Sequence, residues 1–220
     1  MTELPTLDGP VLPPADGGAA RKLVILVHGV GSDGHDLFGL APYFQKTLPD
    51  ALFIAPDAPY PFDMAPMGYQ WFSIQDFGPE TRLKGTRSAA PVLDAFIDQK
   101  LDEYGLSEER LALVGFSQGT TMSIYVGLRR ERPLAGILGY SGLLVDGALL
   151  PKEIKTRPPV LLIHGGDDQV IPVQALPEAQ EGLEAAGVKV ESHVRPGLGH
   201  GIDDEGLRRG AGFLARIFHV

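Results

Sequence analysis

The sequence predicts a single α/β domain, spanning residues 1–220, whose central sheet is mostly parallel and doubly wound. The chain has 220 residues, a common length for one such domain. It contains several continuous apolar runs of the kind that form strands buried on both faces. Helical patterns separate these runs, and such alternation is typical of a parallel sheet with helices on both of its faces.

Six apolar runs are expected to be strands. The first, at 23–27, is apolar throughout and rich in β-branched residues, and four similar runs suit the centre of the sheet: 51–55, 111–114, 134–138 and 160–163. The sixth run, at 188–194, alternates more and is expected nearer an edge. Residues 1–20 are rich in proline and glycine, so we expect an extended N-terminal arm or a short edge hairpin there.

Helices are predicted between the strands. Apolar residues recur at helical spacing over 92–104, and Gly105 is expected to end that helix. Further helices are expected over 118–130, directly after a strand, and over 173–186. The last helix shows one apolar face, which consists of Leu207, Ala211, Leu214 and Phe218.

Composition excludes several classes of function. The net charge of −9 argues against a nucleic-acid partner, because phosphate binding requires a basic face. The chain has no cysteine, which excludes disulfides, a cysteine nucleophile and cysteine-ligated zinc, and which fits a cytoplasmic protein. No apolar run is long enough for a membrane span, and residues 1–16 do not resemble a signal peptide.

A nucleophile motif follows the apolar run at 111–114. Residues Gly115-Phe116-Ser117-Gln118-Gly119 match the pattern G-x-S-x-G. The pattern alone is weak, but here it follows a strand and opens a helix, which is the setting of a nucleophile elbow. A tight strand–helix turn with an incidental serine is the alternative. The context favours Ser117 as the nucleophile of a hydrolase.

The serine requires a base, and in this type of fold the chain order is serine, acid, histidine. Three histidines besides the terminal His219 follow Ser117: His164, His193 and His200. His200 lies in a glycine-rich loop between the last strand and the last helix, where such a fold builds its site. The order and the position both favour His200 as the base.

The acid is expected in the loop after the strand at 160–163. Asp167 and Asp168 both follow this strand, and spacing alone does not separate them. One would orient the imidazole, and the other would face solvent or cap the following helix.

Backbone amides are expected to bind the oxyanion. One is the N–H of Gln118, the residue after the nucleophile. The other should come from the glycine-rich loop at 28–34. Such a loop can instead cradle a phosphate, but neither the Walker lysine pattern nor a G-x-G-x-x-G fingerprint is present.

Together these residues resemble the phospholipase/carboxylesterase family of small α/β hydrolases, which includes acyl-protein thioesterases and bacterial carboxylesterases. The matching segments extend over nearly the whole chain: the His28-Gly29-Val30-Gly31 loop, Trp71-Phe72, the elbow, the segment 164–172 and Gly199-His200. The resemblance implies an α/β-hydrolase fold without a separate lid domain.

The resemblance also assigns roles. It implies that Asp168 is the acid, that the Val30 amide is the second oxyanion donor, and that Trp71 and Phe72 lie near the acyl pocket. Many relatives have aspartate where this chain has Ser73, so the details of the pocket stay open. Family members often form dimers, so a homodimer is a possible assembly.

The substrate pocket is expected to use the apolar part of the long, proline-rich segment at 56–84, because long loops in compact domains are usually functional or mobile. Core packing is the alternative for each of its apolar residues. The candidates are Phe62, Met64, Met67, Trp71 and Phe72, with Leu143 and Val170 nearby.

The expected chemistry is two-step acyl transfer on a small-molecule ester, thioester or lysophospholipid, and it requires no metal or cofactor. The same triad could instead serve peptidase or perhydrolase activity. A non-catalytic binding module on a hydrolase fold is a further alternative, although such proteins usually lack a triad member.

Overall fold

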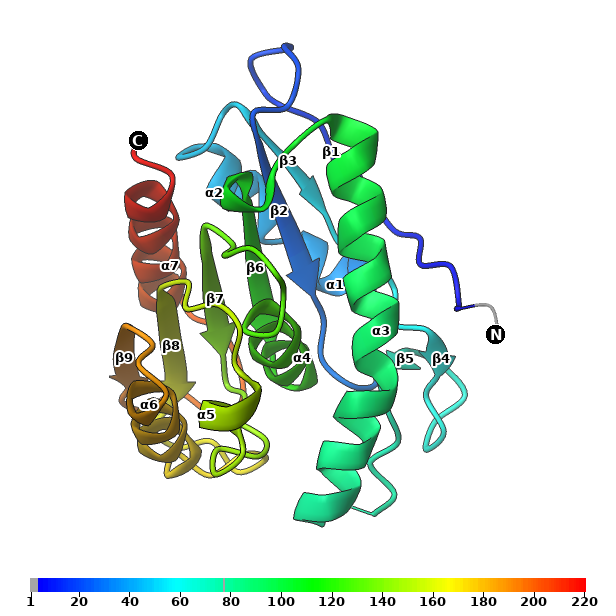
Figure 1. Cartoon of the computed structure of the whole chain (residues 1–220), viewed down its shortest axis with the longest axis vertical. Helices are drawn as coiled ribbons and strands as arrows, with labels where there is room; N and C mark the ends of the chain where they lie inside the picture. Colours follow the sequence, from blue (N-terminus) through cyan, green and yellow to red (C-terminus); the bar gives the residue numbers. More distant parts are fainter. Residues whose placement is uncertain (1–3, 77) are drawn as a thin grey trace.

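Seven strands form the central sheet in the computed structural model, which describes residues 4–76 and 78–220 (Figure 1). Their order across the sheet is β1-β3-β2-β6-β7-β8-β9, and all neighbouring pairs except β1 with β3 are parallel. The mostly parallel sheet predicted from the sequence is therefore confirmed. The strands are β1 (Val11–Leu12), β2 (Lys22–Val27), β3 (Ala51–Ile54), β6 (Leu111–Phe116), β7 (Gly136–Tyr140), β8 (Val160–Gly165) and β9 (Val190–Arg195).

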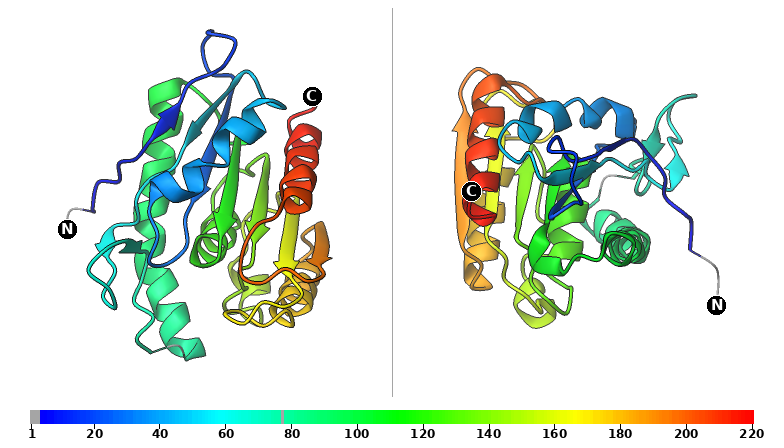
Figure 2. Two further views of the ribbon diagram at one scale, coloured as in Figure 1. Left: turned by 180° about the vertical axis from the view of Figure 1, so that it is seen from behind. Right: turned by 90° about the horizontal axis from the view of Figure 1, so that it is seen from above.

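Helices cover both faces of the sheet, which makes the fold doubly wound (Figure 2). One face carries α1 (Gly34–Phe38), α2 (Ala41–Gln45) and α7 (Asp204–Ile217). The other carries α3 (Pro79–Tyr104), α4 (Gln118–Gly127), α5 (Leu150–Glu153) and α6 (Ala175–Ala185). Within the described part of the chain, no helix combines the length and the hydropathy needed to cross a membrane.

Strand β2 shows why the apolar runs that form the central strands do not alternate with polar residues. Val24 and Leu26 face the layer of α1, α2 and α7, whereas Leu23, Ile25 and Val27 face α3. All five side chains are completely buried. A strand covered on both faces buries every side chain, so it reads as one continuous apolar run.

The N-terminal arm adds an edge strand to the sheet. Val11 and Leu12 pair antiparallel with Ile54 and Phe53 of β3. At the opposite edge lies β9, whose side chains are partly exposed, as its more alternating sequence predicts.

Several boundaries differ from the sequence predictions. Strands β6 and β8 continue beyond their apolar runs, to Phe116 and Gly165, because both still pair with their neighbours there. Pairing of β7 begins at Gly136, not at residue 134, since the Leu134 side chain packs into the cluster under α3. A short 3-10 turn over Glu108–Arg110 precedes β6.

Helix α3 begins earlier than predicted. Pro79 is its first residue, so the expectation of irregular structure up to residue 84 is wrong. Proline suits the first helical position, and residues 79–85 at the start of α3 are a mixture of exposed and half-buried residues without an apolar stripe. The preceding loop contains a small antiparallel pair, β4 (Tyr60–Pro61) and β5 (Tyr69–Gln70). Figure 1 shows the start of α3 reaching past the carboxyl edge of the sheet.

Candidate active site

Ser117 lies at the sharp turn between β6 and α4. Its backbone has a positive φ of 55°, a conformation that is strained for a residue with a side chain. The two flanking glycines are required by contact: a Cβ at Gly115 would lie 2.5 Å from Thr120 Cα, and one at Gly119 would lie 1.8 Å from the Val27 carbonyl oxygen. The turn therefore has the geometry of a nucleophile elbow, with the N-terminus of α4 directly behind the serine.

A short hydrogen bond joins two of the expected triad residues. His200 Nδ1 lies 2.7 Å from Asp168 Oδ2. Asp168 is buried, and its other oxygen accepts the backbone N–H groups of Val170 and Ile171, each at 2.9 Å. Asp167 is exposed on the same loop. Of the two carboxylates left open by spacing, Asp168 is the one that faces the histidine.

The environment keeps Asp168 ionised. Burial alone would raise the pKa of this carboxyl, but the hydrogen bonds from His200 and from the Ile171 and Val170 amides outweigh burial and hold the pKa below its usual value. A carboxylate fixed in this way can hold the His200 imidazole with its Nδ1–H toward the acid.

A second histidine, to which the sequence analysis gave no role, also contacts this carboxylate. His164 is buried at the end of β8, and its Nε2 lies 3.3 Å from Asp168 Oδ2. The same nitrogen donates to the Ile171 carbonyl at 2.9 Å. His164 therefore braces the loop that carries the acid. The sequence signal that could have revealed this contact is the spacing, since His164 precedes Asp168 by four residues.

His200 lies beside the elbow. The loop between β9 and α7 carries it, and its ring packs on Phe116, the residue before Ser117, with ring centroids 4.9 Å apart. Among the described residues, the Ser117 hydroxyl and the His200 imidazole are not hydrogen-bonded to each other. Such bonds are often long without substrate and tighten in the complex.

The loop after β2 also lies against the elbow. A Cβ added at Gly29 would lie 3.2 Å from Ser117 Cβ. Gly31, at a positive φ of 80°, donates its amide to the Tyr69 carbonyl at 2.8 Å. The amide of Val30 has no hydrogen-bond acceptor within the described residues. The amide of Gln118, first residue of α4, has no partner inside its helix. Both amides are therefore available to a ligand.

His28 fixes this loop from within the core. It is completely buried, its Nε2 accepts the Ala58 amide at 2.8 Å, and its Nδ1 donates to the Gly29 carbonyl at 2.7 Å. The indole N–H of Trp71 donates to the His28 carbonyl at 3.0 Å. Burial lowers the pKa of His28, and accepting a hydrogen bond at Nε2 requires the neutral ring.

Replacing His28 with phenylalanine is expected to destabilise the fold by about 1–3 kcal/mol near pH 8, because the buried Ala58 amide loses its acceptor. The loss should shrink as the pH falls below about 6.5, where the unfolded wild-type chain takes up a proton that the folded state resists. Urea unfolding of both proteins at about pH 8 and about pH 5 checks this. An equal loss at both pH values would contradict a neutral, buried His28.

A cavity of about 60 Å³ opens beside Ser117, and its wall is almost entirely apolar. The expected site residues on this wall are Val30, Phe72, Ser117, Gln118, Leu143 and Val170. Residues that the sequence analysis missed complete it: Ile74, Arg82, Thr121 and Ile171. Arg82 was missed because nothing in the sequence shows that the start of α3 reaches this edge of the sheet. Ile74 lies in the segment 56–84 that was expected to form the pocket, but it was not among the named candidates.

Four of the predicted pocket residues do not line this cavity. Trp71 is completely buried and supports the His28 loop. Met64 and Met67 are exposed, at 59% and 80%, between β4 and β5. Phe62 packs on the loop after β2, since a Cβ at Gly31 would lie 3.2 Å from its ring.

The Gln118 side chain ties the elbow to the segment after β5. Its Oε1 accepts the Trp71 amide at 2.9 Å, and its Nε2 donates to the Phe72 carbonyl at 2.8 Å. This pair of bonds fixes the backbone at Phe72 relative to Ser117.

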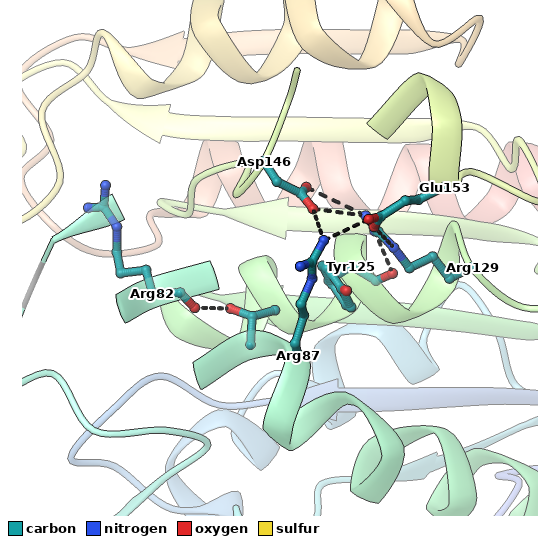
Figure 3. Close-up of polar contacts among 7 residues, drawn as sticks. Arg82, Arg87, Tyr125, Arg129, Asp146 and Glu153 are labelled. Carbon is teal, nitrogen blue, oxygen red and sulfur yellow. Dashed lines mark hydrogen bonds and ion pairs between the residues drawn. The ribbon is translucent and has the colours of Figure 1, made fainter. Parts of the chain in front are cut away.

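Ion pairs hold the loop that carries Leu143 (Figure 3). This loop joins β7 to α5 and contains the buried carboxylate of Asp146. Arg129, two residues after the end of α4, contacts Asp146 at 3.1 Å and Glu153 at 2.7 Å, and Arg87 of α3 contacts Glu153 at 2.6 Å. These ion pairs join α3, α5 and the turn after α4 to the loop that carries Leu143. Figure 3 also shows the Arg82 side chain reaching away from this network.

Comparison with known proteins identifies the family of this chain. The model of the phospholipase/carboxylesterase family matches residues 14–217. Esterase YpfH of Escherichia coli is 31% identical over 190 residues, which cover 86% of this chain and 80% of that protein. Acyl-protein thioesterase 1 of Gibberella zeae is 30% identical and covers 88% of this chain and 89% of its own length.

Solved structures show the same fold. The crystal structure of esterase PE8 has 42% sequence identity and a TM-score of 0.93, and the match covers 96% of this chain and 99% of that one. The family model covers most of the chain, and the fold matches that of an esterase along its whole length. This chain therefore belongs to the phospholipase/carboxylesterase family and is a hydrolase with the α/β-hydrolase fold.

Proposed function

We propose that this protein is a serine esterase that hydrolyses carboxylic esters of short acyl groups. The observation that carries the proposal is the environment of Ser117, which lies at a strained turn beside a small apolar cavity. The hydrogen-bonded pair of His200 and Asp168 comes from the neighbouring loops at the same edge of the sheet. Nucleophile, base and orienting acid are the set that acyl transfer requires.

In the proposed reaction, His200 Nε2 takes the proton of the Ser117 hydroxyl as its oxygen attacks the ester carbonyl. Nε2 is the free nitrogen because Nδ1 faces Asp168. The imidazolium then protonates the leaving alcohol, and an acyl-enzyme remains on Ser117. Water, deprotonated by the same histidine, attacks the acyl-enzyme and releases the acid and the free serine.

The Val30 and Gln118 amides are proposed to bind the oxyanion. Both residues line the cavity beside Ser117. Each such donor is worth about 3–4 kcal/mol in the transition state, because it is fixed in advance where the negative charge develops.

The size of the cavity favours short acyl groups. One water-sized group occupies about 10–15 Å³ of such space. A cavity of about 60 Å³ then accepts an acyl group of about four to six heavy atoms. Apolar walls favour an uncharged alkyl chain.

A substrate panel tests this proposal. We expect kcat/KM for p-nitrophenyl esters to be highest between acetate and hexanoate and to fall for longer chains. The panel should include a short-chain acyl thioester, because one relative is named an acyl-protein thioesterase, and also a lysophospholipid and a peptide amide. A protein that prefers the palmitoyl ester or the lysophospholipid would contradict short-chain specificity. A protein that prefers the peptide amide would contradict the esterase itself.

A further inference from the structure

A second hollow lies next to the acyl cavity. It is a groove of about 560 Å³ between the segment after β5 and helix α3. Both hollows have walls from the segment after β5 and from α3, and β5 lies beside α3 in Figure 1. On α3, Arg82 belongs to the acyl cavity, whereas Lys84 and Gly85 belong to the groove.

Phe72 is the residue that lines both hollows. Its side chain is buried against α3 at Gly85, where an added Cβ would lie 2.7 Å from the Phe72 ring. The absence of a side chain at Gly85 lets the ring pack closely against the helix. Phe72 therefore lies where the small cavity beside Ser117 and the larger groove adjoin.

The backbone of Phe72 is held independently of its ring. Gln118 Nε2 donates to the Phe72 carbonyl at 2.8 Å, and Gln118 Oε1 accepts the amide of the preceding Trp71. Shortening the Phe72 side chain should remove the wall and leave this segment, and the elbow, in place.

We propose that Phe72 determines acyl-chain length by ending the acyl cavity, and that the groove behind it is a closed-off continuation of that cavity. This inference rests on the proposed function, because it assigns the cavity to the acyl group. In the wild type, a chain longer than the cavity meets the Phe72 ring. Without the ring, the distal methylene groups of a longer chain enter the groove, whose lining includes apolar surface.

Replacing Phe72 with alanine is the direct test. The ratio of kcat/KM for p-nitrophenyl decanoate to that for the butyrate should rise at least about tenfold, since accommodating even one further methylene in an apolar pocket changes discrimination by about that much. Phe72→Leu, which keeps part of the wall and disturbs packing less, should give a smaller rise in the same direction.

Ile74→Ala is the matched control. Ile74 lines the same cavity but not the groove, so removing its bulk opens no path between the two hollows. Its decanoate-to-butyrate ratio should change far less than that of Phe72→Ala. Labelling of Ser117 by a fluorophosphonate in each variant, together with a thermal melt, shows that the variant is folded and its nucleophile active.

The outcomes separate this inference from the proposed function. If Phe72→Ala and Phe72→Leu are labelled and keep the wild-type ratio, Phe72 is not the wall. Phe72 is also not the wall if the wild type already has equal kcat/KM for decanoate and butyrate. The same holds if Ile74→Ala raises the decanoate-to-butyrate ratio as much as Phe72→Ala does. If the folded wild type hydrolyses no ester and is not labelled, the proposed function itself fails.

Discussion

Replacing Ser117 with alanine should lower kcat for short-chain esters by roughly 10⁵–10⁶-fold, the loss that follows removal of a serine nucleophile in a triad enzyme. The covalent acyl-enzyme cannot form without the hydroxyl, and only the oxyanion donors and substrate binding would still act. Steady-state turnover of p-nitrophenyl butyrate, with active-site titration to exclude contaminating wild type, measures the effect.

Ser123 provides a matched control on the same helix. Its hydroxyl is buried and has no hydrogen-bond partner among the described residues. Ser123→Ala therefore removes an equivalent atom from α4 without touching the cavity. We expect this variant to keep wild-type kcat and to be no less stable, because an unsatisfied buried hydroxyl is lost. Full esterase activity in Ser117→Ala would contradict the assignment of the nucleophile.

The second large effect is expected at Asp168. Asp168→Asn should lower kcat by about 10⁴-fold, as is typical when an amide replaces the triad acid and stabilises the wrong imidazole tautomer. The amide keeps one oxygen for the Val170 and Ile171 N–H groups, so the loop should keep its conformation. Its NH₂ group, however, would face His200 Nδ1 in place of Asp168 Oδ2.

Asp167→Asn makes the same chemical change one residue earlier, on an exposed side chain. This control should keep wild-type kcat. Both variants change the net charge equally, so comparing Asp168→Asn with Asp167→Asn measures the effect of the hydrogen bond to His200 separately from the change in net charge. An equal loss in both variants, or wild-type kcat in Asp168→Asn, would contradict the role of Asp168.

The central architecture could be predicted from the sequence because its signals are local. A strand that is buried on both faces has to be continuously apolar. In β2, neighbouring residues face different helical layers, so every side chain is buried. The elbow is recognised from five consecutive residues, although only Gly115 is imposed by a contact within the turn, whereas Gly119 is imposed by the approach of the Val27 carbonyl of β2.

The choice between Asp167 and Asp168 needed more than the strand that precedes them. Their spacing is compatible with either assignment, and the resemblance to the family implied Asp168. The fold shows that Asp168 is the buried carboxylate that faces His200. His164 was overlooked for a related reason: its contact with Asp168 depends on how the loop after β8 turns back.

The pocket was the least predictable part. Trp71 and Met64 are apolar residues of one loop, yet one is completely buried and the other is 59% exposed. Arg82 reaches the cavity because α3 starts near the edge of the sheet, and the first turns of this helix carry no apolar pattern that could reveal this. Pocket walls depend on long-range packing, which composition and periodicity do not encode.

The most direct test of Ser117 as the nucleophile is fluorophosphonate labelling of the folded wild-type protein, followed by intact-mass analysis and peptide mapping. We predict one adduct per chain, located on Ser117, with none in Ser117→Ala and normal labelling in Ser123→Ala. A folded wild-type protein that takes up no label, or an adduct that maps to another residue, would contradict the covalent mechanism.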